Sequence, residues 1–244
     1  RGSPPVNSLR LIEERAMPDK VAIEVWDRWI RLFHWGLVLT ILFSFYTTKT
    51  SAAPFLFPIE VHAQAGYLVI GLLIFRWLWG VLGSVYARFQ TFLYPPTKAM
   101  AYSKALIKRK PSVYASHNPL GGWMVVVMLL SLSFQAVSGL FLSDDIFFQA
   151  PLYTLVSDAI SSQLRTLHQW NSDFLLILIG LHLVGLIVHR LLSEPLLAAM
   201  WAGTKRFHRQ PVDARSEPLN AAMLRLRALG CLLIATGVVV WLWF

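Results

Sequence analysis

Five long apolar runs set the strongest limit on what this chain can fold into. They lie at about residues 29–46, 62–83, 120–141, 167–189 and 224–244. Each approaches the roughly 20 residues that an α-helix needs to cross about 30 Å of hydrocarbon. The 244 residues are 56% hydrophobic and only 14% charged, so a soluble fold would have too little polar surface to cover five buried helices. We therefore expect an all-α membrane protein with five transmembrane helices.

The single cysteine, Cys231, limits the chemistry that the chain can carry. One cysteine cannot form an intramolecular disulfide, a CxxCH haem attachment or a four-cysteine metal site. Metal chemistry would therefore use the seven histidines, the carboxylates or a cofactor that is held without a covalent bond.

The basic residues indicate orientation rather than a nucleic-acid partner. A net charge of +9 would suggest nucleic-acid binding in a soluble chain. Here 19 of the 22 Lys and Arg residues lie before or in the first turn of the first run, between the second and third runs, or between the fourth run and the first turn of the fifth. The other two connections hold Lys49 and Arg165, together with the acids Glu60, Asp144, Asp145 and Asp158. The positive-inside rule then predicts a bacterial inner-membrane protein with a cytoplasmic N-terminus and a periplasmic C-terminus, and no nucleic-acid partner.

Some shorter segments also predict local structure. The first 16 residues are polar, and Met17 after them is typical of a natural start, so we expect 1–16 to be a tag or disordered leader. Residues 97–110 and 195–207 mix apolar and basic side chains. Each segment is predicted to be either a helix that lies on an anionic membrane leaflet or a solvated basic loop. Asn118 and Pro119 predict a helix start, with Asn118 as the cap. His117 and His208 are interpreted as loop or cap residues without a ligand role.

Four histidines lie at membrane depth, where an ionisable side chain is expensive and indicates function. His34 lies on the cytoplasmic side of the first run, whereas His62 and His168 open the second and fourth runs on the outer side. His182 follows His168 by 14 residues, which places both on nearly one helix face and about 21 Å apart. The depths then pair His62 with His168, and His34 with His182.

Two imidazoles at equal depth on facing helices are what a six-coordinate b-type haem requires. We therefore predict two non-covalent haems, ligated by His34, His62, His168 and His182. A dinuclear metal site is disfavoured, because about 21 Å between the two ligands on one helix far exceeds the roughly 4 Å of metal pairs. A transporter that uses buried histidines as proton relays is a further alternative, and it would show no haem absorption.

Three neighbouring residues have weaker assignments. His189 lies seven residues past His182. As the inner ligand it would lie about 31 Å along the helix from His168, the outer ligand. We therefore interpret it as an interfacial residue near a haem propionate or a quinone. Arg76 follows His62 by 14 residues and could pair with a propionate of the inner haem. Arg31 is a second propionate candidate, or an arginine that snorkels to the interface.

These residues resemble the bacterial cytochrome b561 family and the related membrane cytochrome b subunits of nickel-iron hydrogenases. The resemblance runs from about residue 21 to residue 206. It rests on the stretches 25–28, 33–35, 75–76, 79–80, 86–89 and 117–121, and on the spacing of the histidines. It implies a four-helix bundle with two b haems, ligated by the same four histidines, and electron exchange between a membrane quinone and a redox partner. We accordingly expect a dihaem four-helix domain at 17–210, and a linker with a fifth helix at 211–244.

Three functions follow from this resemblance. The first is a dihaem electron carrier between the quinone pool and a periplasmic partner such as a c-type cytochrome, with the mildly acidic outer connections steering a basic partner. The second is the membrane anchor of a periplasmic hydrogenase or other oxidoreductase, and the third is a superoxide or quinone oxidoreductase that acts alone. A homodimer is compatible with each of the three.

Overall fold

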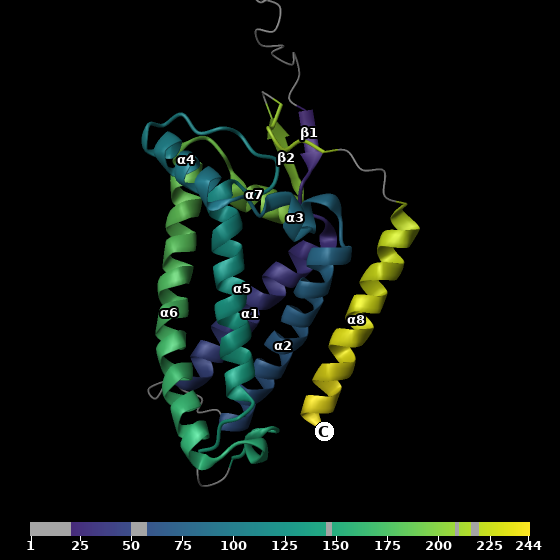
Figure 1. Ribbon diagram of the computed structural model, residues 1–244. Coiled ribbons are helices and arrows are strands. Elements are labelled where there is room, and N and C mark those ends of the chain that lie inside the picture. The colour runs from purple at the N-terminus through teal and green to yellow at the C-terminus, as the bar shows by residue number, and fades with distance from the viewer. Residues whose placement is uncertain (1–20, 50–57, 145–147, 208–209, 216–219) are drawn as a thin grey trace, which may run out of the picture.

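The computed structural model describes residues 21–49, 58–144, 148–207, 210–215 and 220–244. Five long helices dominate it (Figure 1), and all five are long and apolar enough to cross a membrane. They are α1 (Arg28–Lys49), α2 (Ile59–Leu82), α5 (Pro119–Gly139), α6 (Asp158–Leu191) and α8 (Ala221–Trp243). The prediction of an all-α membrane protein with five spans is confirmed. The leader at 1–16, Met17, Asp145 and His208 lie outside the described residues.

The long helices pack in sequence, except for one gap that matters for the site. α1 packs along α2, α2 along α5, and α5 along α6, while α8 lies along the other side of α2 (Figure 1). Among the described residues, α6 makes only sparse contact with α1 and α2. Most of the apolar side chains of α6 are therefore not buried by other helices. α6 thus stands opposite α1 and α2 without packing tightly against either.

The short elements gather at one end of the bundle, which we call the strand end. There β1 (Val21–Glu24) pairs antiparallel with β2 (Thr204–Phe207), beside α3 (Phe89–Phe92), α4 (Pro96–Ile107) and α7 (Leu196–Ala202) (Figure 1). A 3-10 turn, Val85–Ala87, also follows α2 at this end. At the opposite end lie the C-terminus of α8 and the connection between α5 and α6, which contains the 3-10 turn Tyr153–Leu155.

The structure differs from the sequence-based boundaries in two places. The fourth apolar run begins at residue 167, but α6 begins at Asp158, capped by Ser157, so His168 lies about three turns inside the helix. Hydropathy marks the apolar part of a helix and misses a polar first segment. The segment 97–110 is largely helix α4, whereas 195–207 divides into α7 and β2. Asn118 caps α5 as predicted, accepting a hydrogen bond from the Gly121 amide at 2.8 Å.

Gly203 ends α7 and allows the chain to turn back along β1. Its φ of 84° is left-handed, a conformation that glycine adopts without the penalty that a Cβ brings. Its carbonyl accepts hydrogen bonds from the amides of Val25 and Trp26 at 2.9 and 3.0 Å. A Cβ at this position would lie 2.8 Å from the Trp26 carbonyl oxygen. This turn therefore fixes the segment after α6 against the start of α1.

The carboxylate of Asp27 joins the start of α1 to the end of α2. Oδ1 accepts from the Trp29 and Ile30 amides at 2.8 and 2.9 Å and so caps α1. Oδ2 accepts from Trp79 Nε1 at 3.0 Å and from the Ser84 hydroxyl at 2.5 Å. Asp27 is buried, and four donors satisfy its charge, as burial in a low-dielectric interior requires.

Asn171 performs a similar role between α5 and α6 in the middle of the membrane. Its amide nitrogen donates to the Ser131 carbonyl at 3.0 Å and to Gln135 Oε1 at 2.7 Å, and its Oδ1 accepts from the Ser131 hydroxyl at 2.7 Å. Interhelical hydrogen bonds of this kind hold helices together where the solvent is as apolar as the side chains. They fix the rotation of α6, and with it the direction in which its histidines point.

Replacing Asp27 with alanine should destabilise the bundle. The change removes a helix cap and leaves the Trp79 indole N–H buried without an acceptor, which together should cost about 2–4 kcal/mol. Thermal unfolding of the purified protein in detergent measures the loss. Glu24→Ala removes an exposed acid three residues away and should change stability little. Equal stability of the two variants would contradict the role assigned to Asp27.

Candidate functional site

Two of the four histidines meet near the opposite end of the bundle. His62 on α2 and His168 on α6 lie with their ring centroids 6.5 Å apart. Both rings are partly buried. They face each other across the space where α6 does not pack against α2. The structure therefore brings together the pair that the sequence assigns to the outer side.

Hydrogen bonds at Nδ1 fix which nitrogen of each ring is available. His62 Nδ1 lies 3.2 Å from the Ser44 carbonyl oxygen, which can only accept, so Nδ1 carries the proton. His168 Nδ1 lies 2.9 Å from the Ser138 hydroxyl, which itself donates to the Gln135 carbonyl at 3.1 Å. That hydroxyl therefore accepts from His168 Nδ1. In both rings Nε2 keeps its lone pair, the arrangement that metal-ligating histidines use.

His34 and His182 form the second pair, nearer the strand end. His34 on α1 and His182 on α6 are within electrostatic range of each other, and both rings are partly buried. Nδ1 of His34 is buried and has no hydrogen-bond partner among the described residues. A buried polar nitrogen without a partner is costly, so it marks a place where a further group binds.

His189 is held by the protein itself. The ring is buried, Nδ1 lies 3.2 Å from Glu194 Oε2, and Nε2 lies 3.0 Å from the Asn118 side-chain nitrogen. Asn118 Oδ1 is already committed to the Gly121 amide at 2.8 Å, so its NH₂ group must face His189. Nε2 therefore accepts, and Nδ1 donates to Glu194. With both nitrogens occupied, His189 links the end of α6 to the start of α5.

The two arginines of the sequence analysis lie in different surroundings. Arg76 is 4% exposed, its guanidinium lies 4.6 Å from the Phe89 ring, and its Nη1 has no partner among the described residues. Arg31 donates from Nη1 to the Trp201 carbonyl at 2.8 Å, which ties α1 to α7. Nε of Arg31 is buried without a partner among the described residues. Arg31 thus has a structural bond that the sequence did not predict.

His117 is the residue that sequence reasoning missed. Its ring lies 4.7 Å from the Trp26 ring and 4.5 Å from the Phe92 ring, between β1 and α3. Burial lowers the pKa of His117 to about 3, and the nearby charges of Arg76 and Lys205 act in the same direction. The imidazole is therefore neutral at physiological pH. Asn118 takes the capping role, and no spacing signal in the sequence places His117 beside the strand-end pair.

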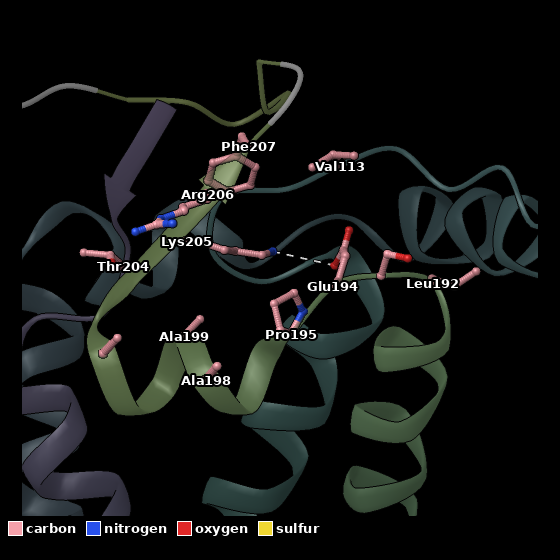
Figure 2. A pocket seen from close by; sticks show the side chains of 12 residues that line it. Val113, Leu192, Glu194, Pro195, Ala198, Ala199, Thr204, Lys205, Arg206 and Phe207 are labelled. Carbon is pink, nitrogen blue, oxygen red and sulfur yellow. Dashed lines mark ion pairs between the residues drawn. The ribbon is translucent and has the colours of Figure 1, made fainter. Parts of the chain in front are cut away.

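A cavity of about 530 Å³ opens at the strand end beside α7 and β2. Ala198 and Ala199 of α7 line one wall, and Lys205 of β2 reaches across towards Glu194 (Figure 2). Lys205 Nζ lies 3.6 Å from Glu194 Oε2 and donates to the Tyr114 carbonyl at 2.9 Å. The cavity therefore combines apolar walls with one charged pair, and Glu194 connects it to His189.

The family comparison agrees with this architecture. Residues 25–203 match the family model described as prokaryotic cytochrome b561. No curated protein and no solved structure matches the chain. The match covers more than half of the chain, so the protein belongs to the prokaryotic cytochrome b561 family, whose members are membrane b-type cytochromes in electron transfer. α8 lies outside the matched residues.

The described residues fit the b-type haem that the family implies. Two histidine pairs face the space between α6 and the helices α1 and α2, and hydrogen bonds at Nδ1 leave Nε2 of His62 and of His168 with a lone pair. The buried, unpartnered atoms of His34 and Arg76 lie towards the strand end of the same space. A porphyrin needs ring nitrogens for its iron and donors for its carboxylates, and these residues offer both.

The Glu194 carboxylate should make stability depend on pH. Burial by itself would raise the pKa of Glu194, but the hydrogen bond from His189 and the charge of Lys205 outweigh it and lower the pKa below its usual 4.5. Stability from this group is therefore complete above pH 4.5 and is lost as the pH falls through the lower folded-state pKa.

Glu194→Gln should lower stability by about 1.5–3 kcal/mol at neutral pH, the range for hydrogen bonds to a charged group. The difference from the unmodified protein should shrink as the pH is lowered past the folded-state pKa of Glu194. Thermal unfolding between about pH 7 and pH 3 measures this. Glu60→Gln, at an exposed position, is the control. A constant difference at every pH would show that the Glu194 charge is not involved.

Proposed function

We propose that the protein holds two b haems, one between His62 and His168 and one between His34 and His182. The support is geometric: each pair joins α6 to a helix against which α6 does not pack closely. The 14-residue spacing on α6 sets the two pairs about 21 Å apart along the helix axis. Bound haem supplies reversible one-electron chemistry at iron.

The residues around each pair have defined tasks in this proposal. Ser44 and Thr47 orient His62, and Ser138 orients His168, so that each Nε2 lone pair points away from its own helix. A ligand oriented in this way loses little freedom on binding. Asn171 fixes the rotation of α6 between its two histidines. The bundle therefore presents the imidazoles of His62 and His168 in a fixed orientation.

We further propose that electrons pass between the membrane quinone pool and a periplasmic redox partner such as a c-type cytochrome. The basic residues support a cytoplasmic strand end by the positive-inside rule, and that rule makes the opposite end periplasmic in an inner-membrane protein. At that opposite end, Glu60 and Asp158 lie in the first turns of α2 and α6, and Asp144 lies in the connection between α5 and α6. A mildly acidic face of this kind steers a basic partner towards the outer haem.

The anchor function is the second candidate, and α8 is compatible with it. The resemblance implies a fifth helix in the hydrogenase type and in some b561-like proteins, and here α8 packs against α2 so closely that a Cβ at Gly71 would lie 2.5 Å from Val239 Cγ2. Affinity purification from gently solubilised membranes separates the two functions. A stoichiometric periplasmic oxidoreductase subunit indicates an anchor, and a cytochrome that binds transiently indicates a carrier. Oxidation of superoxide without any partner would indicate the stand-alone enzyme.

The cavity at the strand end supports a quinone site in this proposal. Its alanine wall suits a ring, and the Glu194 carboxylate can accept a proton from a quinol hydroxyl. α7 also lies beside the part of α1 that carries His34, because the Trp201 ring lies 5.6 Å from the Trp35 ring, which lies 5.2 Å from the His34 ring. A quinone in this cavity would thus lie at the same end of the bundle as the strand-end pair.

Single histidine substitutions should remove one haem each. His168→Ala should remove the haem at the opposite end, and His182→Ala should remove the strand-end haem. In each variant the affected haem loses one of its two axial nitrogen ligands. A pyridine haemochrome assay on the purified variants should show half of the haem of the unmodified protein. His189→Ala should keep both haems, since that ring is bonded to Asn118 and Glu194. Loss of a haem in His189→Ala, with both kept in His182→Ala, would overturn the assignment.

Filling the cavity should slow electron exchange with quinol. Ala198→Trp places an indole at the cavity wall, where it should block the quinol. The loss of binding free energy should be at least about 1.4 kcal/mol, which corresponds to about tenfold lower affinity for quinol. Stopped-flow absorbance of haem reduction by decylubiquinol measures the rate. Leu197→Trp, on the same helix but outside the cavity lining, should react at the unmodified rate. Equal rates in the two variants would place the quinone elsewhere.

A further inference from the structure

A buried positive charge at the strand end has no acceptor for one of its nitrogens. Arg76 is 4% exposed, and Nη1 makes no hydrogen bond to any described residue. Its guanidinium lies 4.6 Å from the Phe89 ring and 6.0 Å from the Phe92 ring. Aromatic faces offset part of the cost of burying a cation, but they do not replace a hydrogen-bond acceptor. The position therefore requires a further group with a negative charge.

The nearest acid cannot supply that acceptor. Asp27 is within electrostatic range of Arg76, but four donors already occupy its two oxygens, two backbone amides on Oδ1 and the Trp79 and Ser84 side chains on Oδ2. Releasing one of them to bind Arg76 would leave another buried donor unsatisfied, at a cost comparable to the gain. The acceptor for Arg76 must therefore come from outside the described chain.

His117 presents a second unsatisfied nitrogen close by. Nδ1 of His117 is buried and has no hydrogen-bond partner among the described residues. The Trp26 and Phe92 rings at 4.7 and 4.5 Å restrict the imidazole. Phe92 thus contacts both His117 and Arg76, which are within electrostatic range of each other. Arg76 Nη1 is a donor, and a neutral His117 can carry its proton on Nδ1. Held against one aromatic ring, the two groups form a small site for an anion.

The position of this site indicates which anion it takes. His117 is also within electrostatic range of His34 and His182, the strand-end pair. A carboxylate on a group held by that pair would therefore lie within reach of Arg76 and His117. Guanidinium and imidazole N–H groups are well matched to a carboxylate, and such charge-assisted bonds are the strong ones.

We propose that Arg76 and His117 together bind one propionate carboxylate of the strand-end haem. The inference rests on the proposed function, because it presupposes a haem between His34 and His182. Arg76 supplies charge and a fork of donors, and His117 supplies one neutral N–H from a ring that its aromatic neighbours hold in place. His117, in the loop before α5, is therefore a cofactor-binding residue in this proposal.

Two variants of His117 distinguish this role from simple packing. His117→Asn keeps an amide N–H near the position of Nδ1 but loses the ring. His117→Phe keeps a ring between Trp26 and Phe92 but has no donor. If His117 binds the carboxylate, the Asn variant should behave like the unmodified protein and the Phe variant should not. If the ring matters only for packing, the Phe variant should behave like the unmodified protein and the Asn variant should not.

The measurement is a potentiometric titration of both haems, combined with infrared difference spectra using haem labelled with ¹³C at the propionates. Arg76→Gln and His117→Phe should each lower the midpoint potential of the haem that is missing in His182→Ala, because a less neutralised carboxylate favours ferric iron. We expect the electron distribution between the two haems to shift by about tenfold in Arg76→Gln, which corresponds to about 59 mV for one electron. The labelled carboxylate band should move in the same two variants.

Several results would overturn this proposal. One is a shift in midpoint potential that is confined to the haem between His62 and His168. Another is an unchanged midpoint potential and carboxylate band in His117→Phe. Equal behaviour of the Asn and Phe variants also excludes the proposed donor. If Arg76→Gln does not assemble with haem, the two His117 variants still test the proposal, because they keep the guanidinium charge of Arg76. Absence of a strand-end haem from the unmodified protein would instead refute the proposed function itself.

Discussion

The cost of placing polar groups in hydrocarbon governs this structure. Each buried donor, acceptor or charge needs a partner, because lipid offers none. Where the chain supplies the partner, the group holds the fold together: Asp27 joins α1 to α2, Asn171 joins α5 to α6, and His189 joins α6 to α5. Where the described residues supply none, as at His34, Arg76 and His117, we propose that a bound group does. The partners of the buried polar groups thus distinguish residues that hold the fold together from residues of the proposed site.

The two ends of the bundle carry different kinds of polar structure. At the opposite end, hydroxyl and carbonyl groups of α1 and α5 orient the rings of His62 and His168. At the strand end, charged side chains collect around the β1–β2 pair, and Lys205, Glu194 and His189 form one connected group. In the proposed function, the opposite end exchanges single electrons with a soluble partner. The strand end also handles protons and a carboxylate, which explains why its titratable groups are concentrated there.

Much of the site could be predicted from the sequence, because helix geometry is regular. A fixed rise and rotation per residue put His168 and His182 on one face at two depths, and the structure brings His62 and His168 to within 6.5 Å. The start of α6 was misplaced, since its first turns are polar and hydropathy does not register them. The loop position of His117 was predicted correctly, but its contacts were not, because Trp26 and Phe92 are 91 and 25 positions away in the chain.

The sequence by itself determined that the chain has five membrane-spanning helices, which of them carry histidines, and that one cysteine leaves histidine as the expected ligand for iron. These properties follow from apolar length, helical period and composition, which are local. Only the tertiary structure decided the partners of each polar group. His189 bonds to Asn118 and Glu194, the oxygens of Asp27 are fully occupied, and Arg76 Nη1 and His117 Nδ1 lie near Phe92 without a partner among the described residues. Such pairings depend on which distant segments meet, and no local pattern encodes that.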